Sequence, residues 1–181
     1  MRKQHGFTLV ELMVAVAISA IALSLAVPAL DGFLSGARQT GAINDFVTSV
    51  HRARSTAITE NRRVTLCPSR SGSNCEDVAW HEGWIAFADD DSDQIIDDNE
   101  KVISIASTAT GVTIESSEFA SGLLYRPNGR ISSDDETAGT FGAFTVCDNR
   151  GNRRAKVMIV DFSGRPHLSE TNADGSAPNC S

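Results

Sequence analysis

The chain has 181 residues, of which 41% are hydrophobic, and a formal net charge of −7 at pH 7. This length is enough for one globular domain, or at most two small ones, besides a membrane segment, and the ordinary hydrophobic content excludes a disordered chain. The acidic balance argues against a broad surface that binds polyanions.

An apolar stretch from Phe7 to Val27 follows the short basic start MRKQHG. Its length suits a membrane-spanning helix, which needs about 20 apolar residues. The stretch also contains Glu11, and an ionised side chain near the middle of a spanning helix costs about 2.5–3.5 kcal/mol. An ordinary membrane anchor and a signal peptide cleaved near Ala26 both fit the stretch, but neither explains this carboxylate.

The segment GFTLVEL resembles the processing site of type IV prepilins, in which a dedicated peptidase cuts after the glycine and methylates the new N-terminal residue. The resemblance implies that residues 1–6 are a leader, that the cut falls between Gly6 and Phe7, and that Phe7 is N-methylated. Glu11 is then an assembly residue, whose carboxylate pairs with the α-amino group of the next subunit. Such a buried pair sets the axial register more than it adds net stability.

A long helix is expected over residues 7–60, with its first half in the membrane. Pro28 lacks a backbone N–H and clashes with the preceding turn, so we expect a kink or a local melt there and a helix that resumes near Asp31. Apolar residues then recur at spacings of three and four, which is typical of a helix that packs one face on a domain. These residues are Ile43, Phe46, Val50, Ala53 and Ala57.

Residues 61–181 contain short runs rich in β-branched and aromatic residues, such as RVTLC, GWIAFA and GAFTVC, separated by turn-rich segments such as SRSGSN and DNRGN. This pattern predicts antiparallel sheet built of hairpins. The run from Val157 to Val160 is almost entirely apolar, which indicates a central strand. The expected fold class is therefore α+β, with a long N-terminal helix packed on a β-rich globular domain.

All four cysteines lie in the β-rich part, and none has the short C-x2-C spacing of a zinc site. Disulfides formed in an oxidising compartment fit this distribution, and free buried thiols are the alternative. Four cysteines allow three connectivities. We favour Cys67–Cys75, which closes a short loop, and Cys147–Cys180, which holds the C-terminal tail.

The β-rich part resembles the globular domain of the GspH/FimT/FimU group of minor pilins and pseudopilins. The ordered motifs that carry this resemblance are VTLCPSRSGSNC, GWIAFADDD, LLYRPNGRI, FTVCDNRG and VDFSGRPHL. Together with the N-terminal segment, they imply a pilin-like fold and a minor type IV pilin that helps initiate or cap pilus assembly, in twitching motility, adhesion or DNA uptake. A minor pseudopilin of type II secretion is the alternative.

The same resemblance implies a location and partners. The protein is expected in the bacterial inner membrane as a single-pass protein with a periplasmic C-terminal domain, and afterwards in a pilus or pseudopilus. Its expected partners are the prepilin peptidase, other minor and major pilins, and the inner-membrane assembly platform.

The acidic segment DDDSDQIIDDNE has the ligand spacing of an EF-hand calcium loop. The carboxylates at positions one, three, five, nine and twelve are Asp89, Asp91, Asp93, Asp97 and Glu100. Position eight is Ile96, but position six, which is glycine in EF-hands, is Gln94. The flanking runs predict strands, so the segment is a candidate calcium-binding hairpin; a solvated acidic loop without metal is the alternative.

A basic cluster near the C-terminus is a candidate DNA-binding site, comprising Arg150, Arg153, Arg154, Arg165 and His167. Members of the FimT group that act in DNA uptake have a G-R-x-R motif near the C-terminal strand. Gly164 and Arg165 match this motif, but His167 replaces its second arginine and is a weaker phosphate partner, because the unperturbed histidine pKa is about 6.5. The alternative is that these arginines pair with the many aspartates.

Enzyme signatures such as G-x-S-x-G, the P-loop and H-E-x-x-H do not occur in the sequence. We therefore expect no catalytic activity, and the catalytic event that concerns this chain is its own processing by the prepilin peptidase.

Overall fold

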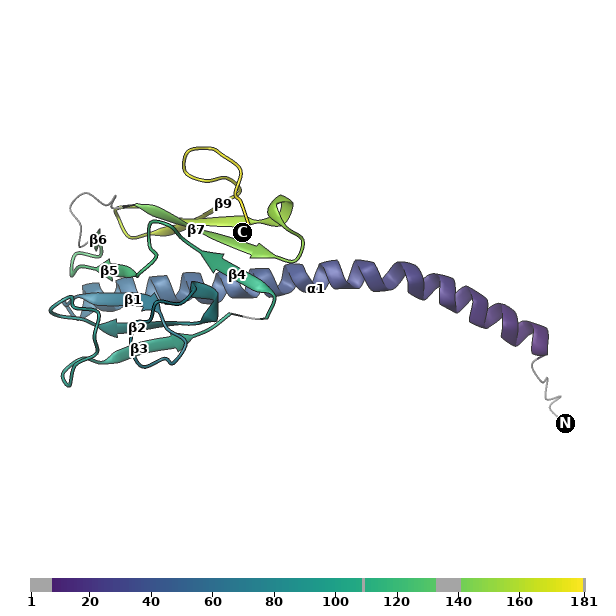
Figure 1. Ribbon diagram of the computed structural model, residues 1–181, viewed down its shortest axis with the longest axis horizontal. Helices are drawn as coiled ribbons and strands as arrows, with labels where there is room; N and C mark the ends of the chain where they lie inside the picture. Colours follow the sequence, from purple (N-terminus) through teal and green to yellow (C-terminus); the bar gives the residue numbers. More distant parts are fainter. Residues whose placement is uncertain (1–7, 109, 133–140, 181) are drawn as a thin grey trace.

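The computed structural model describes residues 8–108, 110–132 and 141–180. In this part of the chain, one long helix, α1 (Leu9–Thr59), is followed by two antiparallel sheets. The C-terminal half of α1 lies along both sheets, whereas its N-terminal half projects away from them (Figure 1). The observed fold is thus the expected α+β arrangement of a long helix packed on a β-rich domain.

The first sheet contains β1 (Val64–Pro68), β2 (Trp84–Ala88), β3 (Val102–Ala106), β5 (Leu123–Tyr125) and β6 (Ile131–Ser132). Its strand order is β3–β2–β1–β5–β6, so β1 lies in the middle, and all five of its residues are buried. Strands β2 and β3 pair directly and are joined by the acidic loop of residues 89–101.

The second sheet contains β4 (Val112–Glu115), β7 (Gly142–Asp148), β8 (Lys156–Val160) and β9 (Pro166–Ser169), in the order β4–β7–β8–β9. Strand β8 pairs with a strand on each side, and its residues 157–160 are all buried. The interior position predicted for this apolar run is therefore confirmed. Two short 3₁₀ helices, η1 (Trp80–Glu82) and η2 (Asn152–Arg154), precede β2 and β8.

The core lies between the C-terminal half of α1 and the two sheets, and the five apolar helix positions predicted to face it are all buried. Phe46 is at its centre, 1% exposed. Its ring meets those of Trp80, Trp84 and Phe144 edge to face, with centroids 5.3, 5.0 and 4.8 Å away. Aromatic pairs in this geometry add about 0.5–1.5 kcal/mol each to the gain from burial, so Phe46 joins the helix to both sheets.

Of the two alternatives expected at Pro28, a kink or a local melt, the structure excludes the melt, because α1 runs unbroken from Leu9 to Thr59; the kink stays a prediction. A proline inside a helix removes one backbone donor and crowds one carbonyl, and the hydrogen bonds on either side can keep the helix intact. The helix curves gradually over its N-terminal half (Figure 1). The expected C-terminal end agrees with the structure, where Glu60 caps the helix.

Replacing Phe46 with alanine should lower the free energy of unfolding by about 3–5 kcal/mol, because the cavity would lie where three aromatic rings converge. Denaturant unfolding of the full-length protein in detergent, followed by tryptophan fluorescence, measures this loss. Phe33→Ala is the matched control, since Phe33 is 71% exposed on the same helix. Equal losses in the two variants would contradict the central position of Phe46.

Candidate functional site

The projecting half of α1 is apolar on all sides. This half contains an 18-residue apolar stretch, none of which is buried against the described chain. Its length and composition suit a membrane span, although a signal sequence near an N-terminus meets the same criteria. A helix that is apolar all round needs cover from lipid or from other apolar helices.

Glu11 lies in the first turn of this helix and forms a capping box with Thr8. The Thr8 hydroxyl accepts a hydrogen bond from the Glu11 backbone N–H at 3.2 Å, and the Glu11 carboxylate accepts one from the Thr8 N–H at 3.5 Å. The Glu11 side chain is exposed and forms no salt bridge with any residue in the described part of the chain. Gly6 and Phe7, the predicted cleavage and methylation positions, lie outside the described residues.

Arg150 joins the middle of α1 to the second sheet. Its guanidinium donates to the Asp148 carboxylate at 2.5 and 2.8 Å, to the Gln39 side-chain oxygen at 3.0 Å and to the Gly32 carbonyl at 3.4 Å. The Asp148 side chain is 1% exposed. Burial alone would raise the pKa of Asp148, but the hydrogen bonds and charge of Arg150 outweigh it and hold that pKa below its ordinary value.

Gln39 completes this junction, and sequence reasoning missed it. It is 4% exposed on α1, and its side-chain amide donates to the Val146 carbonyl and to the Arg154 carbonyl, both at 3.0 Å. A polar residue on a helix face carries no sequence signal of a partner more than 100 positions away. A buried amide with three hydrogen bonds fixes how the helix sits on the sheet.

The structure divides the predicted basic cluster into two groups. Arg153 and Arg154 are exposed on η2, next to Arg150, which is engaged with Asp148. Arg165 and His167 lie at the opposite end of β8, since the chain turns there and His167 pairs in register with Ile159. The five residues therefore do not form one continuous patch.

The turn before β9 is built around a close backbone contact. Gly164 has φ +72°, and a Cβ atom there would lie 2.4 Å from the Gly129 carbonyl. The Tyr125 hydroxyl donates to the Gly164 carbonyl at 3.2 Å. From α1, Arg54 donates to the Gly129 and Ser163 carbonyls at 3.1 and 3.2 Å. The glycines of the RPNGR and SGRPH motifs thus have a structural role, where these loops pack together beside the helix.

The acidic loop between β2 and β3 brings only part of the predicted calcium set together. One carboxylate oxygen from each of Asp89, Asp91 and Asp93 lies within 4.8 Å of the others. Asp97 and Glu100 are outside this group. Glu100 accepts hydrogen bonds from the backbone N–H groups of Asp90 and Asp97, at 2.8 and 3.2 Å, so its carboxylate braces the loop.

Both disulfides have the connectivity that the sequence favours. Cys67 pairs with Cys75, with 5.5 Å between their Cα atoms, and Cys147 pairs with Cys180, with 5.9 Å. The second bond ties the C-terminal tail to β7, and the Cys180 N–H also donates to the Asn152 side chain at 2.9 Å. The tail is therefore held against the second sheet.

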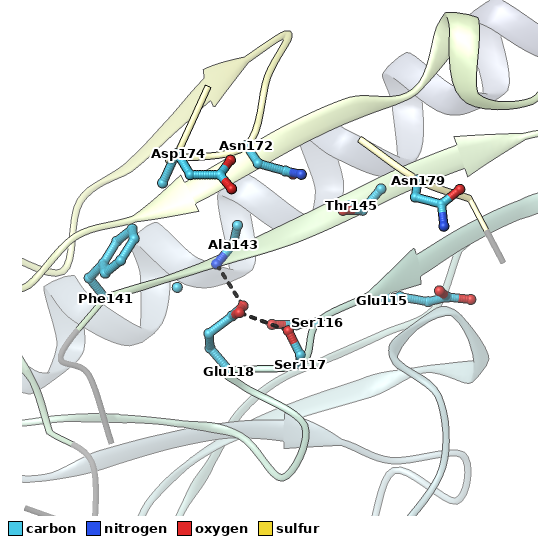
Figure 2. Close-up of a pocket in the computed structure, with 12 residues that line it drawn as sticks. Glu115, Ser116, Ser117, Glu118, Phe141, Ala143, Thr145, Asn172, Asp174 and Asn179 are labelled. Carbon is cyan, nitrogen blue, oxygen red and sulfur yellow. Dashed lines mark hydrogen bonds between the residues drawn. The ribbon is translucent and has the colours of Figure 1, made fainter. Parts of the chain in front are cut away.

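A hollow lies between β7 and the C-terminal tail (Figure 2). Its lining includes Glu118, whose carboxylate accepts hydrogen bonds from the Ser117 hydroxyl at 2.7 Å and from the Ala143 N–H at 3.3 Å. The residues that line it carry carboxylates, amides and hydroxyls but include no histidine, cysteine or lysine. The hollow thus does not assemble a nucleophile with a histidine or lysine base.

In comparisons with known proteins, family models match two regions of the chain. The family model described as type II transport protein GspH matches residues 42–164, and the one described as prokaryotic N-terminal methylation motif matches residues 1–27. No curated protein matches the chain. Two crystal structures of the type IV minor pilin FimU of Pseudomonas aeruginosa share the fold, with a TM-score of 0.57 and 19% identity. They cover 78% of this chain and 94% and 99% of the FimU chains.

Replacing Arg150 with methionine should lower the free energy of unfolding by about 3 kcal/mol, because it leaves the Asp148 carboxylate buried without its cation. Chemical denaturation at pH 7 measures the loss. Arg153→Met is the matched control, since Arg153 is exposed on the neighbouring 3₁₀ helix. A loss of the same size in the control would contradict the role given to Arg150 in joining α1 to the second sheet.

The ion pair of Asp148 and Arg150 also predicts that the stability of the protein depends on pH. The pKa of Asp148 is lower in the folded state than in the unfolded state. The ionised carboxylate therefore stabilises the fold fully above the unfolded-state pKa of about 3.9, and this stabilisation is lost as the pH falls through the folded-state pKa. The stability difference between the parent protein and Arg150→Met should therefore be largest near neutral pH and narrow below about pH 4. A difference that stayed constant on acidification would contradict this.

Proposed function

The chain belongs to the family described as type II transport protein GspH, whose model spans residues 42–164, and we propose that it is a minor pilin that helps initiate or cap a type IV pilus. The fold that it shares with the type IV minor pilin FimU supports the pilus in this proposal. The prokaryotic N-terminal methylation motif over residues 1–27 supports processing by a prepilin peptidase. The proposed cut falls between Gly6 and Phe7, and Phe7 is the residue methylated.

The observation that carries this proposal is the exposed apolar half of α1 with Glu11 in its first turn. Before assembly, lipid covers such a helix; within a filament, the helices of neighbouring subunits take the place of the lipid. An unpaired carboxylate is costly in both environments. The α-amino group at Phe7 of the next subunit would neutralise Glu11 and set the axial position of the incoming subunit.

The β-rich domain suits the periplasmic side of the membrane. Its two disulfides are of a kind that persists in the oxidising bacterial periplasm. The leader carries Arg2 and Lys3, and basic residues beside a membrane segment favour the cytoplasmic side. The proposed topology is thus a cytoplasmic leader, one span and a periplasmic domain, which meets the peptidase, the assembly platform and other pilins in the inner membrane.

Glu11→Ala should leave cleavage intact and sharply reduce incorporation into filaments, because the variant cannot neutralise the amine of its neighbour. Intact-mass measurement of the membrane-extracted protein follows cleavage and methylation, and immunoblotting of sheared filaments follows incorporation. Asp31→Ala is the matched control, an exposed carboxylate on the same helix beyond the apolar stretch.

Normal incorporation of Glu11→Ala would overturn the role given to this carboxylate. A mature chain that began at Met1, or that was cut near Ala26, would overturn the processing pathway. The two measurements therefore test the residue and the pathway separately.

A minor pseudopilin of type II secretion would share this architecture. A cellular experiment is therefore needed to test whether the protein serves a type IV pilus or type II secretion. Deleting the gene should abolish or strongly reduce surface pili and twitching and leave the secretion of exoproteins unchanged. Complementation with the parent gene should restore piliation. Normal piliation together with lost secretion would overturn the pilus assignment in favour of the pseudopilin.

A further inference from the structure

The loop that joins β2 to β3 carries three carboxylates that lie close enough together to share a metal ion. We propose that Asp89, Asp91 and Asp93 bind one calcium ion at the end of the domain farthest from the projecting helix. This inference concerns a part of the chain that pilus assembly through α1 does not involve, and it stands independently of the proposed function.

The spacing of the three carboxylates suits one shared ion. Their ligand oxygens lie within 4.8 Å of one another. Oxygens bound to a common calcium ion at about 2.4 Å lie at most about 4.8 Å apart, so these separations are compatible with one shared ion. Without a cation, the mutual repulsion of these negative charges would oppose this arrangement.

Unsatisfied buried oxygens give a second and independent indication. Asp89 is 0% exposed, and its Oδ2 accepts a hydrogen bond from the Thr65 hydroxyl at 2.5 Å. Its Oδ1 is buried and, within the described chain, has no hydrogen-bond partner. The Oγ of Ser92, in the same loop, is also buried without a partner there. Buried polar atoms are almost always paired, and an ion accounts for an unpaired carboxylate oxygen beside two other carboxylates.

Nearby arginines do not neutralise the cluster. Arg62 forms its salt bridge with Asp90, at 2.8 Å, and Arg63 donates to the Asp90 carbonyl at 3.2 Å. Among the residues that the structure describes, no salt bridge reaches Asp89, Asp91 or Asp93. Within the described chain, Asp90 thus has a cationic partner, whereas the three aspartates of the cluster have none.

The loop has Gln94 at its sixth position, where an EF-hand has glycine, yet its backbone makes the turn that this glycine usually allows. Gln94, at the sixth position of the loop, has φ 63°, and Ser92 has φ 68°. This is the left-handed conformation that glycine adopts at the sharp turn of an EF-hand. A non-glycine residue takes it only where its surroundings hold it there.

Two contacts hold the rest of the loop in place. Ile96, at the eighth position, packs against the apolar cluster of Cys67, Ile85 and Phe87. Glu100 closes the loop by accepting hydrogen bonds from the backbone N–H groups of Asp90, near its start, and of Asp97. The loop is therefore braced by an apolar contact and by the Glu100 carboxylate. Asp93 also accepts a hydrogen bond at its Oδ1 from the Ile95 N–H at 2.8 Å, which orients its carboxylate within the loop.

The chemistry of the donors favours calcium. All three side chains offer hard carboxylate oxygens, which excludes the thiolate and imidazole ligands typical of zinc sites. Magnesium requires near-ideal octahedral geometry and gives up its water reluctantly, whereas calcium accepts irregular oxygen sets completed by water. The hairpin loop lies at the end of the domain opposite the N-terminus (Figure 1), where the medium outside the membrane would supply the ion.

The test uses the full-length protein in detergent micelles, freed of metal by dialysis against EDTA. Isothermal titration with calcium chloride should show one site with a Kd on the order of 10⁻⁴–10⁻³ M, as in extracellular calcium modules. Calcium at ten times this Kd should raise the Tm by about 3–6 °C, and the same concentration of magnesium should raise it less.

Matched double variants locate the site. Asp91→Asn with Asp93→Asn removes two charges from exposed ligands and should weaken calcium binding at least about tenfold, since affinity follows the number of charged ligands. Asp97→Asn with Asp98→Asn removes two charges from the same loop outside the cluster and should retain the thermal shift. Circular dichroism without calcium confirms that both variants are folded.

The absence of any calcium response from the parent protein up to millimolar concentration would overturn the proposal. So would an unchanged response in the Asp91/Asp93 variant, or an equal loss in both double variants. An equal thermal shift with magnesium would overturn the assignment of calcium. None of these results depends on whether the protein enters a filament.

Discussion

A single unbroken helix has to satisfy two different environments, and the rest of the molecule depends on how it does so. Over its N-terminal half, α1 exposes apolar side chains on every face; over its C-terminal half, it buries one face between two sheets. Because no break separates the halves, any force that positions the apolar half also positions the domain. A filament subunit built this way carries its domain on a continuous rod.

The domain is attached to this rod by two polar junctions with an aromatic contact between them. Arg150 and Gln39 join the middle of the helix to β7 and η2, and Arg54 joins its last turns to the packed loops before β6 and β9. Phe46 lies between the junctions among three aromatic rings. Burial of rings stabilises the packing without fixing its direction, whereas the directional hydrogen bonds fix the rotation and register of the helix on the sheets.

Properties that depend on local periodicity could be predicted from the sequence. The buried helix face that includes Phe46, and the interior strand of residues 157–160, both follow from apolar spacing. Properties that depend on distant partners could not. Arg150 suggested a basic patch, but its partners are Asp148 and, more than 100 residues away, Gln39. Glu100 had the right spacing for a ligand, yet backbone N–H groups in its own loop compete for its oxygens.

The two proposed sites lie at opposite ends of the long axis, and their physics differs accordingly. Glu11 would act between subunits, where a pair of charges in an apolar bundle specifies position more than it stabilises. The aspartate cluster would act within one subunit, because Asp89 is hydrogen-bonded to Thr65 in the central strand β1. An ion bound there would transmit its binding free energy to the fold of the domain. Calcium would therefore change how firmly each subunit is folded without changing how subunits are spaced along the filament.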